Sequence, residues 1–88
     1  MDIAIGSENL ELSMEQINIS SASPLANTSL QNAGLRQRFG VIVVGIQRQD
    51  RHFDFNPDPN AMLLEGDKLI VLGSTESLKR LEHEGMGS

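Results

Sequence analysis

Apolar and polar residues alternate in the first third of the chain, and this alternation predicts an amphipathic strand. Leu10 and Met14 share one parity of the alternation, whereas Ile17 and Ile19 share the other. A regular strand cannot change parity without an extra residue. We therefore expect a β-bulge or a break near Glu15–Gln16.

Two later runs are apolar at consecutive positions, which is typical of strands covered on both faces. The first reads VIVVGIQ at 41–47 and the second reads KLIVLG at 68–73. Between them, the sequence HFDFN alternates again and places Phe53 and Phe55 on one face of a further strand. The polar sequence RQDR at 48–51 predicts the hairpin turn that joins this strand to the first run.

Two segments carry the start and stop signals of helices. Thr28, with Gln31 three residues later, fits a capping box, and Gly34 fits a helix stop. A further turn is expected to follow and to end at Gly40. Near the other end of the chain, Ser74 or the threonine after it is expected to cap a helix.

The predicted order of elements is therefore β-α-β-β-β-α. This order indicates a small α+β domain, with a mixed or antiparallel sheet and helices packed on it. We expect residues 1–9 to be a flexible lead-in, residues 10–83 to form the domain, and residues 84–88 to be a tail. The longest apolar run, Val41–Ile46, is much shorter than the ~20 residues that span a bilayer.

Composition removes several classes of function. The formal net charge of −5 argues against a nucleic-acid partner, because phosphate binding needs a basic surface. The chain contains no cysteine, so disulfides, thiol catalysis and cysteine-ligated zinc are excluded. His52 stands between Asp50 and Asp54, a pattern that is read either as a surface cation site or as a solvated hairpin, and we favour the hairpin. No nucleophile–base pattern or phosphate-binding glycine motif is present, so we expect no enzyme and no metal site.

Arg36 and Arg38 precede the first apolar run and allow two interpretations. Both can be solvated cations that complement a helix dipole, which stabilises a helix by a few tenths of a kcal/mol. Alternatively, the planar guanidinium of Arg36 beside an apolar strand suits a phosphate or an adenine face. Residue chemistry alone favours the first interpretation.

Five motifs, taken in order, resemble the C-terminal subdomain of RCK regulatory modules, which is also called the TrkA-C domain. The resemblance extends roughly from Leu10 to Leu81. The motifs are a Ser-Pro-Leu loop at 23–25, Leu-Arg-x-x-x-Gly at 35–40, an apolar strand ending in Arg at 41–48, an x-Pro-x-Pro turn at 56–59, and Gly-Asp-x-Leu-x-x-x-Gly at 66–73.

The resemblance implies a regulatory domain that forms a homodimer and has no enzymatic activity. In this family the domain lies on the cytoplasmic side of potassium channels, potassium transporters and some cation/proton antiporters. Ligand binding there biases the gate of the membrane-embedded part, which we expect in the same parent chain. The alternative is a constitutive dimerisation module of the same parent that binds no ligand.

The resemblance also implies a ligand site. Some members bind cyclic di-AMP across the dimer interface and others respond to calcium, although no set of calcium ligands carries over to this chain. The members that bind the nucleotide usually have Asn at the position of Ile42 and often Asp at the position of Gly34. Losing the Asn amide removes a hydrogen bond to the base, typically ~1 kcal/mol net. Carried over by position, the site comprises Leu30, Gln31, Leu35, Arg36, Val41, Ile42 and Pro59.

Overall fold

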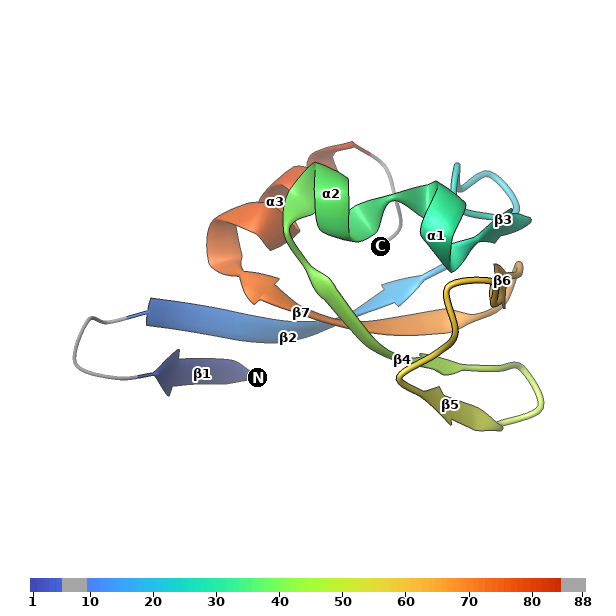
Figure 1. The fold of residues 1–88 in the computed structure, drawn as a ribbon, viewed down its shortest axis with the longest axis horizontal. Helices are drawn as coiled ribbons and strands as arrows, with labels where there is room; N and C mark the ends of the chain where they lie inside the picture. The colour runs from blue at the N-terminus through green and yellow to red at the C-terminus, as the bar shows by residue number, and fades with distance from the viewer. Residues whose placement is uncertain (6–9, 85–88) are drawn as a thin grey trace.

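A five-stranded antiparallel sheet with helices on one side forms the body of the domain (Figure 1). The structure is a computed structural model that describes residues 1–5 and 10–84. The strands lie in the order β1-β2-β7-β4-β5, and each neighbouring pair is antiparallel. Their bounds are Asp2–Ile5 for β1, Leu10–Asn18 for β2, Lys68–Ser74 for β7, Ile42–Gln47 for β4 and Phe53–Phe55 for β5.

The remaining elements lie above this sheet or at its end. Two short strands pair with each other; two helices follow the first of these strands, and a third helix follows β7. The bounds are Thr28–Ser29 for β3, Met62–Leu63 for β6, Leu30–Ala33 for α1, Leu35–Phe39 for α2 and Thr75–His83 for α3. The predicted α+β class is confirmed, whereas β3 and β6 were missed because two residues are too few to show an alternation.

The chain start is part of the sheet in the residues that the structure describes. Asp2–Ile5, predicted to belong to a flexible lead-in, instead form β1 and pair with β2. The backbone of Met1 extends this pairing, because it donates to Met14 at 3.0 Å and accepts from it at 2.8 Å. The rest of the predicted lead-in, 6–9, and most of the predicted tail, 85–88, lie outside the described residues.

The predicted bulge near Glu15–Gln16 is wrong. β2 pairs with β7 in one register along the whole of their contact. The sheet has its irregularity in β4 instead, between Val43 and Gly45. The change of parity in β2 arises because both faces of this strand carry apolar residues: Met14 points away from the helices and Ile17 is buried beneath them.

The first helix begins one residue later than predicted. Its N-cap is Ser29, whose Oγ accepts a hydrogen bond from the backbone N–H of Asn32 at 3.0 Å. Thr28 is not the cap because it pairs in β3, and its hydroxyl donates to the carbonyl of Leu25 at 2.7 Å. Gly34 ends the helix with φ of +62°, as predicted, since glycine adopts this conformation without steric cost.

The later helix boundaries agree with the sequence. Gly40 ends α2 with φ of +71°, and its N–H donates to the carbonyl of Arg36 at 2.8 Å. Ser74 caps α3 and accepts from the backbone N–H of Ser77 at 3.1 Å. Both ends therefore follow from local chemistry that the sequence displays.

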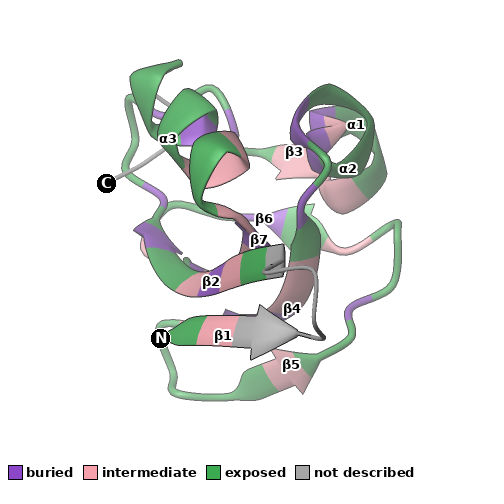
Figure 2. Cartoon of the chain, turned by 90° about the vertical axis from the view of Figure 1, so that its left-hand side faces the viewer, coloured by how far each residue is buried: buried purple, intermediate pink, exposed green. Residues whose placement is uncertain are grey.

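The hydrophobic core lies between the sheet and its helices, on one face of the sheet only (Figure 2). Along β7, Leu69 and Val71 are buried whereas Ile70 and Leu72 are half-buried. The prediction that β4 and β7 are covered on both faces is therefore wrong. The buried apolar residues are Ile17, Ile19, Leu25, Ala33, Leu35, Phe39, Val41, Ile46, Leu63, Leu69, Val71 and Leu81.

A partly buried ion pair joins the end of β4 to the turn before β7. Arg48 donates to a carboxylate oxygen of Asp67 at 2.5 Å and to the carbonyl of Met62 at 2.7 Å. The same oxygen of Asp67 accepts from the backbone N–H of Leu64 at 2.8 Å. Asp67 therefore accepts a backbone hydrogen bond within the turn and also fixes the position of the Arg48 side chain.

Candidate ligand and dimer surface

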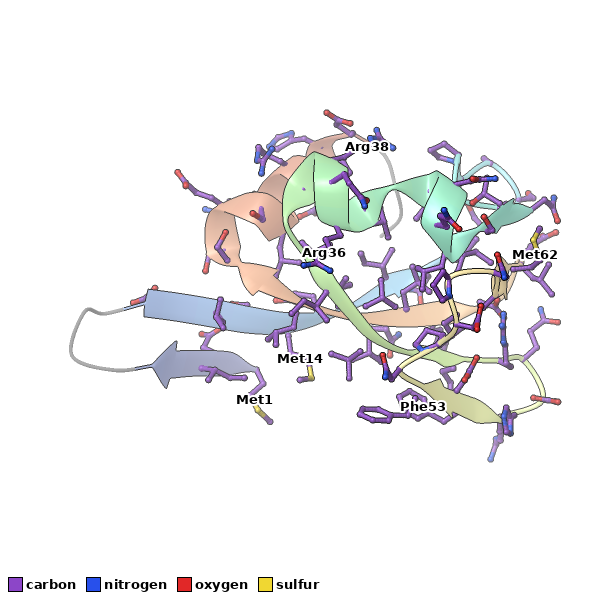
Figure 3. The ribbon with its side chains drawn as sticks, viewed as in Figure 1. Met1, Met14, Arg36, Arg38, Phe53 and Met62 are labelled. Carbon is purple, nitrogen blue, oxygen red and sulfur yellow. The ribbon has the colours of Figure 1, made fainter. Side chains whose placement is uncertain are left out.

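The side of the sheet that faces away from the helices is apolar, and we call it the outer face. Figure 3 shows Met1, Met14 and Phe53 projecting on this side. The most exposed of its large side chains are Met1 at 80%, Phe55 at 70% and Ile42 at 59%. The strand registers assign to the outer face the apolar residues Met1, Ile3, Leu12, Met14, Ile42, Phe53, Phe55, Ile70 and Leu72.

The outer face is also free of acidic strand residues. The whole chain carries 12 Asp and Glu residues, yet none of the described strand residues that the registers place on this face is acidic. Apart from Ser74 at the end of β7, its polar residues gather toward one end and are Gln16, Asn18, Gln47 and Lys68. Depletion of charge around exposed aromatic and aliphatic side chains is the compositional mark of an interface core.

A glycine in β4 allows an aromatic ring to lie flat on this face. A Cβ atom at Gly45 would overlap the ring of Phe53, which extends across β4 from β5. Gly45 pairs with Phe55 in the register, so the ring of Phe53 crosses the neighbouring strand diagonally. The absence of a side chain here therefore shapes the apolar surface.

Part of the predicted ligand site comes together where α1 begins. The backbone N–H of Gln31 donates to the carbonyl of Pro59 at 2.9 Å. The neighbouring N–H of Leu30 donates to the carbonyl of Ala61 at 2.8 Å. Residues 28 apart in the sequence are thus held side by side, with the side chains of Gln31 and Pro59 exposed.

Two of the predicted site residues are buried. The side chains of Leu35 and Val41 lie in the core, with exposed fractions of 2% and 1%. They can support a site, but they present almost no surface to a ligand. Arg36 and Ile42, which adjoin them in sequence, are exposed instead. The surface that these predicted residues can offer therefore consists mainly of a guanidinium and an aliphatic side chain.

The two arginines of α2 have different surroundings. Arg38 forms an ion pair with Glu84 at 3.0 Å, and its guanidinium lies 5.0 Å from the centre of the Phe39 ring. Arg36 is exposed and has no ion pair with any described residue. Figure 3 shows Arg36 beneath α2 beside β4, and Arg38 on the opposite side of the helix. Of these two arginines, only Arg36 thus combines a positive charge that no described acid pairs with and a position close to the sheet.

Metal binding finds little support among the residues that the structure describes. They contain no group of three or more His, Cys, Asp or Glu side chains that could hold an ion. The carboxylate of Asp50 instead accepts a hydrogen bond from the backbone N–H of His52 at 2.9 Å. Within the same residues, no helix has the length and apolar character needed to cross a membrane.

Sequence reasoning missed the outer face as a surface, although one signal for it was present. Phe53 and Phe55 alternate with polar residues, and the prediction that they share one face of a strand is confirmed. The assumption that β4 and β7 are covered on both sides hid its exposure. A count of helices would have helped, since α1 and α2 are too short to cover two faces of a five-stranded sheet.

Comparison with known proteins decides the family. The model of the TrkA-C domain family matches residues 14–84, which is most of the chain and contains both the outer face strands β7, β4 and β5 and the helices above them. The chain belongs to the TrkA-C domain family. The predicted resemblance is confirmed, and this family is regulatory rather than a known class of enzyme.

Relatives of this TrkA-C domain include much longer proteins. A probable potassium channel protein of Methanocaldococcus jannaschii is 34% identical over 73 residues, which are 83% of this chain and 21% of the channel protein. An uncharacterised protein of Bacillus subtilis, YrvC, is 26% identical over 74 residues, which are 84% of this chain and 45% of that protein. The chain thus spans less than half the length of these relatives.

A solved structure shares the fold closely. The RCK C domain of the potassium transport protein KtrA, in complex with cyclic diadenosine monophosphate (c-di-AMP, the cyclic di-AMP named above), superposes with a TM-score of 0.75. It is 27% identical, and the match covers 83% of this chain and 82% of the KtrA domain. The antiparallel sheet with helices on one face is therefore the fold of the family.

Proposed function

We propose that this TrkA-C domain is a cytoplasmic ligand-sensing and dimerising module that regulates a potassium channel or cation transporter. The observation that carries the proposal is the exposed apolar outer face, which is free of acidic strand residues, together with Arg36 beside it. The kinship with a probable potassium channel protein supports the assignment to potassium transport. The membrane-embedded part belongs to the parent chain in this proposal.

Two copies pair through their outer faces. A twofold axis that lies between the two sheets, and parallel to them, brings the same patch of each copy together, and sheets that pack face to face lie ≈10 Å apart. Ile42, Phe53 and Phe55, at 59%, 41% and 70% exposure, supply the side chains that gain most from burial. A chain of 88 residues has a modest core, so burying this face also adds to its stability.

The regulatory ligand is anionic and binds where α2 meets β4. Arg36 offers a guanidinium that no described acid neutralises, and a guanidinium binds a phosphate through two parallel hydrogen bonds. Ile42 offers an apolar surface for a base, and Leu30, Gln31 and Pro59 form the neighbouring wall, backed by the buried Leu35 and Val41. Cyclic di-AMP has this chemistry, and the KtrA domain was solved with it.

Regulation then follows from the dimer geometry. A ligand that binds one arrangement of the two copies more tightly shifts the population toward it. The ligand can shift the equilibrium of an attached gate only by the free energy that corresponds to this difference in affinity. The proposal therefore needs a ligand that contacts both copies.

The second candidate is a constitutive dimerisation module that binds no ligand. It is favoured by Ile42, which is exposed and aliphatic where the nucleotide-binding members usually have Asn. Under this alternative the outer face still forms the dimer interface, and the region around Arg36 binds no ligand.

Titration calorimetry of the purified domain with cyclic di-AMP, and then with calcium, tests the proposal. We expect saturable heat at one nucleotide per two chains, and a loss of at least about tenfold in affinity for Arg36→Ala, as for a lost charged hydrogen bond. Arg38→Ala is the matched control, because Arg38 belongs to the same helix but pairs with Glu84. No heat with either ligand, in a protein that sediments as a dimer, would establish the alternative.

A further inference from the structure

A polar pocket lies at the end of the sheet where β4 ends and β7 begins (Figure 1). Its volume of about 710 Å³ falls within the range of sites that hold small molecules. Gln47, in the pocket wall, and Ile42, near Arg36, are the two ends of β4, roughly 17 Å apart at the rise of an extended strand. The pocket is therefore separate from the ligand site proposed above.

Positive charge gathers around this pocket in a chain that is acidic as a whole. Of the 7 Lys and Arg residues of the chain, Arg48, Arg51 and Lys68 line the pocket, and none of the described residues that line it is acidic. Arg48 is neutralised by its ion pair with Asp67. Arg51 and Lys68 are exposed and form no ion pair with a described residue. The pocket therefore presents two positive charges that no described acid pairs with.

The backbone at Arg51 has a conformation that an arginine rarely adopts. The N–H of Arg51 donates to the carbonyl of Arg48 at 3.0 Å, and the N–H of Arg48 donates to the carbonyl of His52 at 2.9 Å, which closes the loop 49–51. The last residue of such a loop is left-handed and commonly glycine. Arg51 occupies this position with φ of +73°, whereas the other described non-glycine residues at positive φ are asparagines, which tolerate it. Backbone strain of this kind is concentrated at binding sites.

Side-chain amides form much of the remaining wall. A Cβ atom at Gly66 would overlap the side chain of Gln49, so this amide lies directly over the glycine backbone. Gln16 and Gln47, at the polar end of the outer face, provide two more amides. Each amide offers both donors and an acceptor, which suits hydroxyl groups. None of the described lining residues has an aromatic or aliphatic side chain, so a base or an apolar group gains no contact surface here.

We propose that this pocket binds a small phosphate ester with a hydroxylated remainder, such as a sugar phosphate. The phosphate carries nearly two negative charges at neutral pH, which match Arg51 and Lys68. The guanidinium of Arg51 can bind two phosphate oxygens in parallel, and the glutamine amides bind the hydroxyl groups. The proposal rests neither on Arg36 nor on dimerisation. Lysine is depleted in interface cores, so we expect this end of the outer face to stay open when two copies pair.

Titration of the intact 88-residue protein with glucose 6-phosphate, followed by amide chemical shifts, tests the proposal. We expect saturable shifts of the backbone amides at 49–51 and 66–68 and of the glutamine side chains. Glucose should give none, and inorganic phosphate should bind roughly fivefold more weakly, as for one lost hydrogen bond.

Three results of this titration would overturn the proposal. The first is the absence of saturable shifts with glucose 6-phosphate. The second is a set of shifts confined to the region around Arg36, which would place the phosphate in the other site. The third is equal affinity for inorganic phosphate, which would replace the ester by the free ion as the ligand.

The variant Arg51→Gly separates binding from folding, because its two expected effects have opposite signs. Glycine adopts positive φ without steric cost, so the variant should unfold at a higher urea concentration than the parent. The same variant loses the guanidinium and should bind glucose 6-phosphate at least about tenfold more weakly. Lys79→Ser removes one positive charge from α3, which does not line the pocket, and should bind as the parent does. Unchanged affinity in Arg51→Gly, or equal weakening in Lys79→Ser, would overturn the proposal.

Discussion

The two faces of the sheet carry similar residues but have opposite environments. On the inner face, Leu69 and Val71 are completely buried beneath the helices. On the outer face, their neighbours Ile70 and Leu72 are half-buried, and Ile42 and Phe55 are largely exposed. A strand that is apolar at consecutive positions therefore need not be covered on both sides in the isolated domain. Its second apolar face can be the surface that a partner covers.

The two faces contribute to different free energies, the inner face to folding and the outer face to association. Inner-face side chains stabilise the fold of one chain, because they leave water when the helices pack on the sheet. Outer-face side chains leave water only when a second surface covers them. Substitutions on the inner face should therefore change the free energy of unfolding, and substitutions on the outer face should change association.

The largest expected effect is at Leu69. Leu69→Ala removes a side chain with 0% exposure and leaves a cavity, so it should lower the free energy of unfolding by about 3 kcal/mol. Leu72→Ala, three residues later on the outer face, is the matched control and should lower it by about 1 kcal/mol. Urea unfolding of both variants gives the measurement. Equal losses would mean that the two faces are buried to the same extent in solution.

A smaller effect is expected where the outer face depends on a glycine. Gly45→Ala puts a methyl group where the ring of Phe53 lies, so the ring must move and the free energy of unfolding should fall by about 1–2 kcal/mol. The overlapping atoms belong to the side chain of Phe53, which can move, so the loss of stability stays moderate.

A double-mutant cycle isolates this contact. In a Phe53→Ala background, Gly45→Ala should cost little, which gives a coupling of about 1 kcal/mol. If Gly45→Ala were as costly without the ring as with it, the strain would lie in the β4 backbone near Val43.

The smallest effect on the stability of one chain is expected at Phe55. Phe55→Ser removes a side chain that is 70% exposed, so the unfolding of dilute monomer should change by less than about 0.5 kcal/mol. Dimer dissociation, measured by sedimentation over a range of concentrations, should become at least about tenfold easier. Lys79→Ser, on the exposed side of α3, should alter neither quantity. An unchanged dimer in Phe55→Ser would remove the outer face from the interface.

Much of the site was accessible from sequence only through the family resemblance. The resemblance selected Gln31 and Pro59, which the structure joins by a backbone hydrogen bond across a long loop. It also selected Leu35 and Val41, whose burial shows that a shared motif can mark a core position beside a site. Residue chemistry favoured a solvated role for both Arg36 and Arg38 and left a ligand role open for Arg36, and the ion pair of Arg38 with Glu84 leaves only Arg36 of the two without a charged partner.

The sequence by itself determined the features that depend on a few neighbouring residues. Gly34 and Gly40 end helices because glycine adopts positive φ, and Ser74 caps a helix because its hydroxyl accepts a backbone N–H. The tertiary structure decided which apolar face of β4 and β7 is covered and that Asp2–Ile5 join the sheet. Those outcomes depend on how many helices pack on the sheet and on where distant strands pair. The periodicity of apolar residues within one strand carries no information about either.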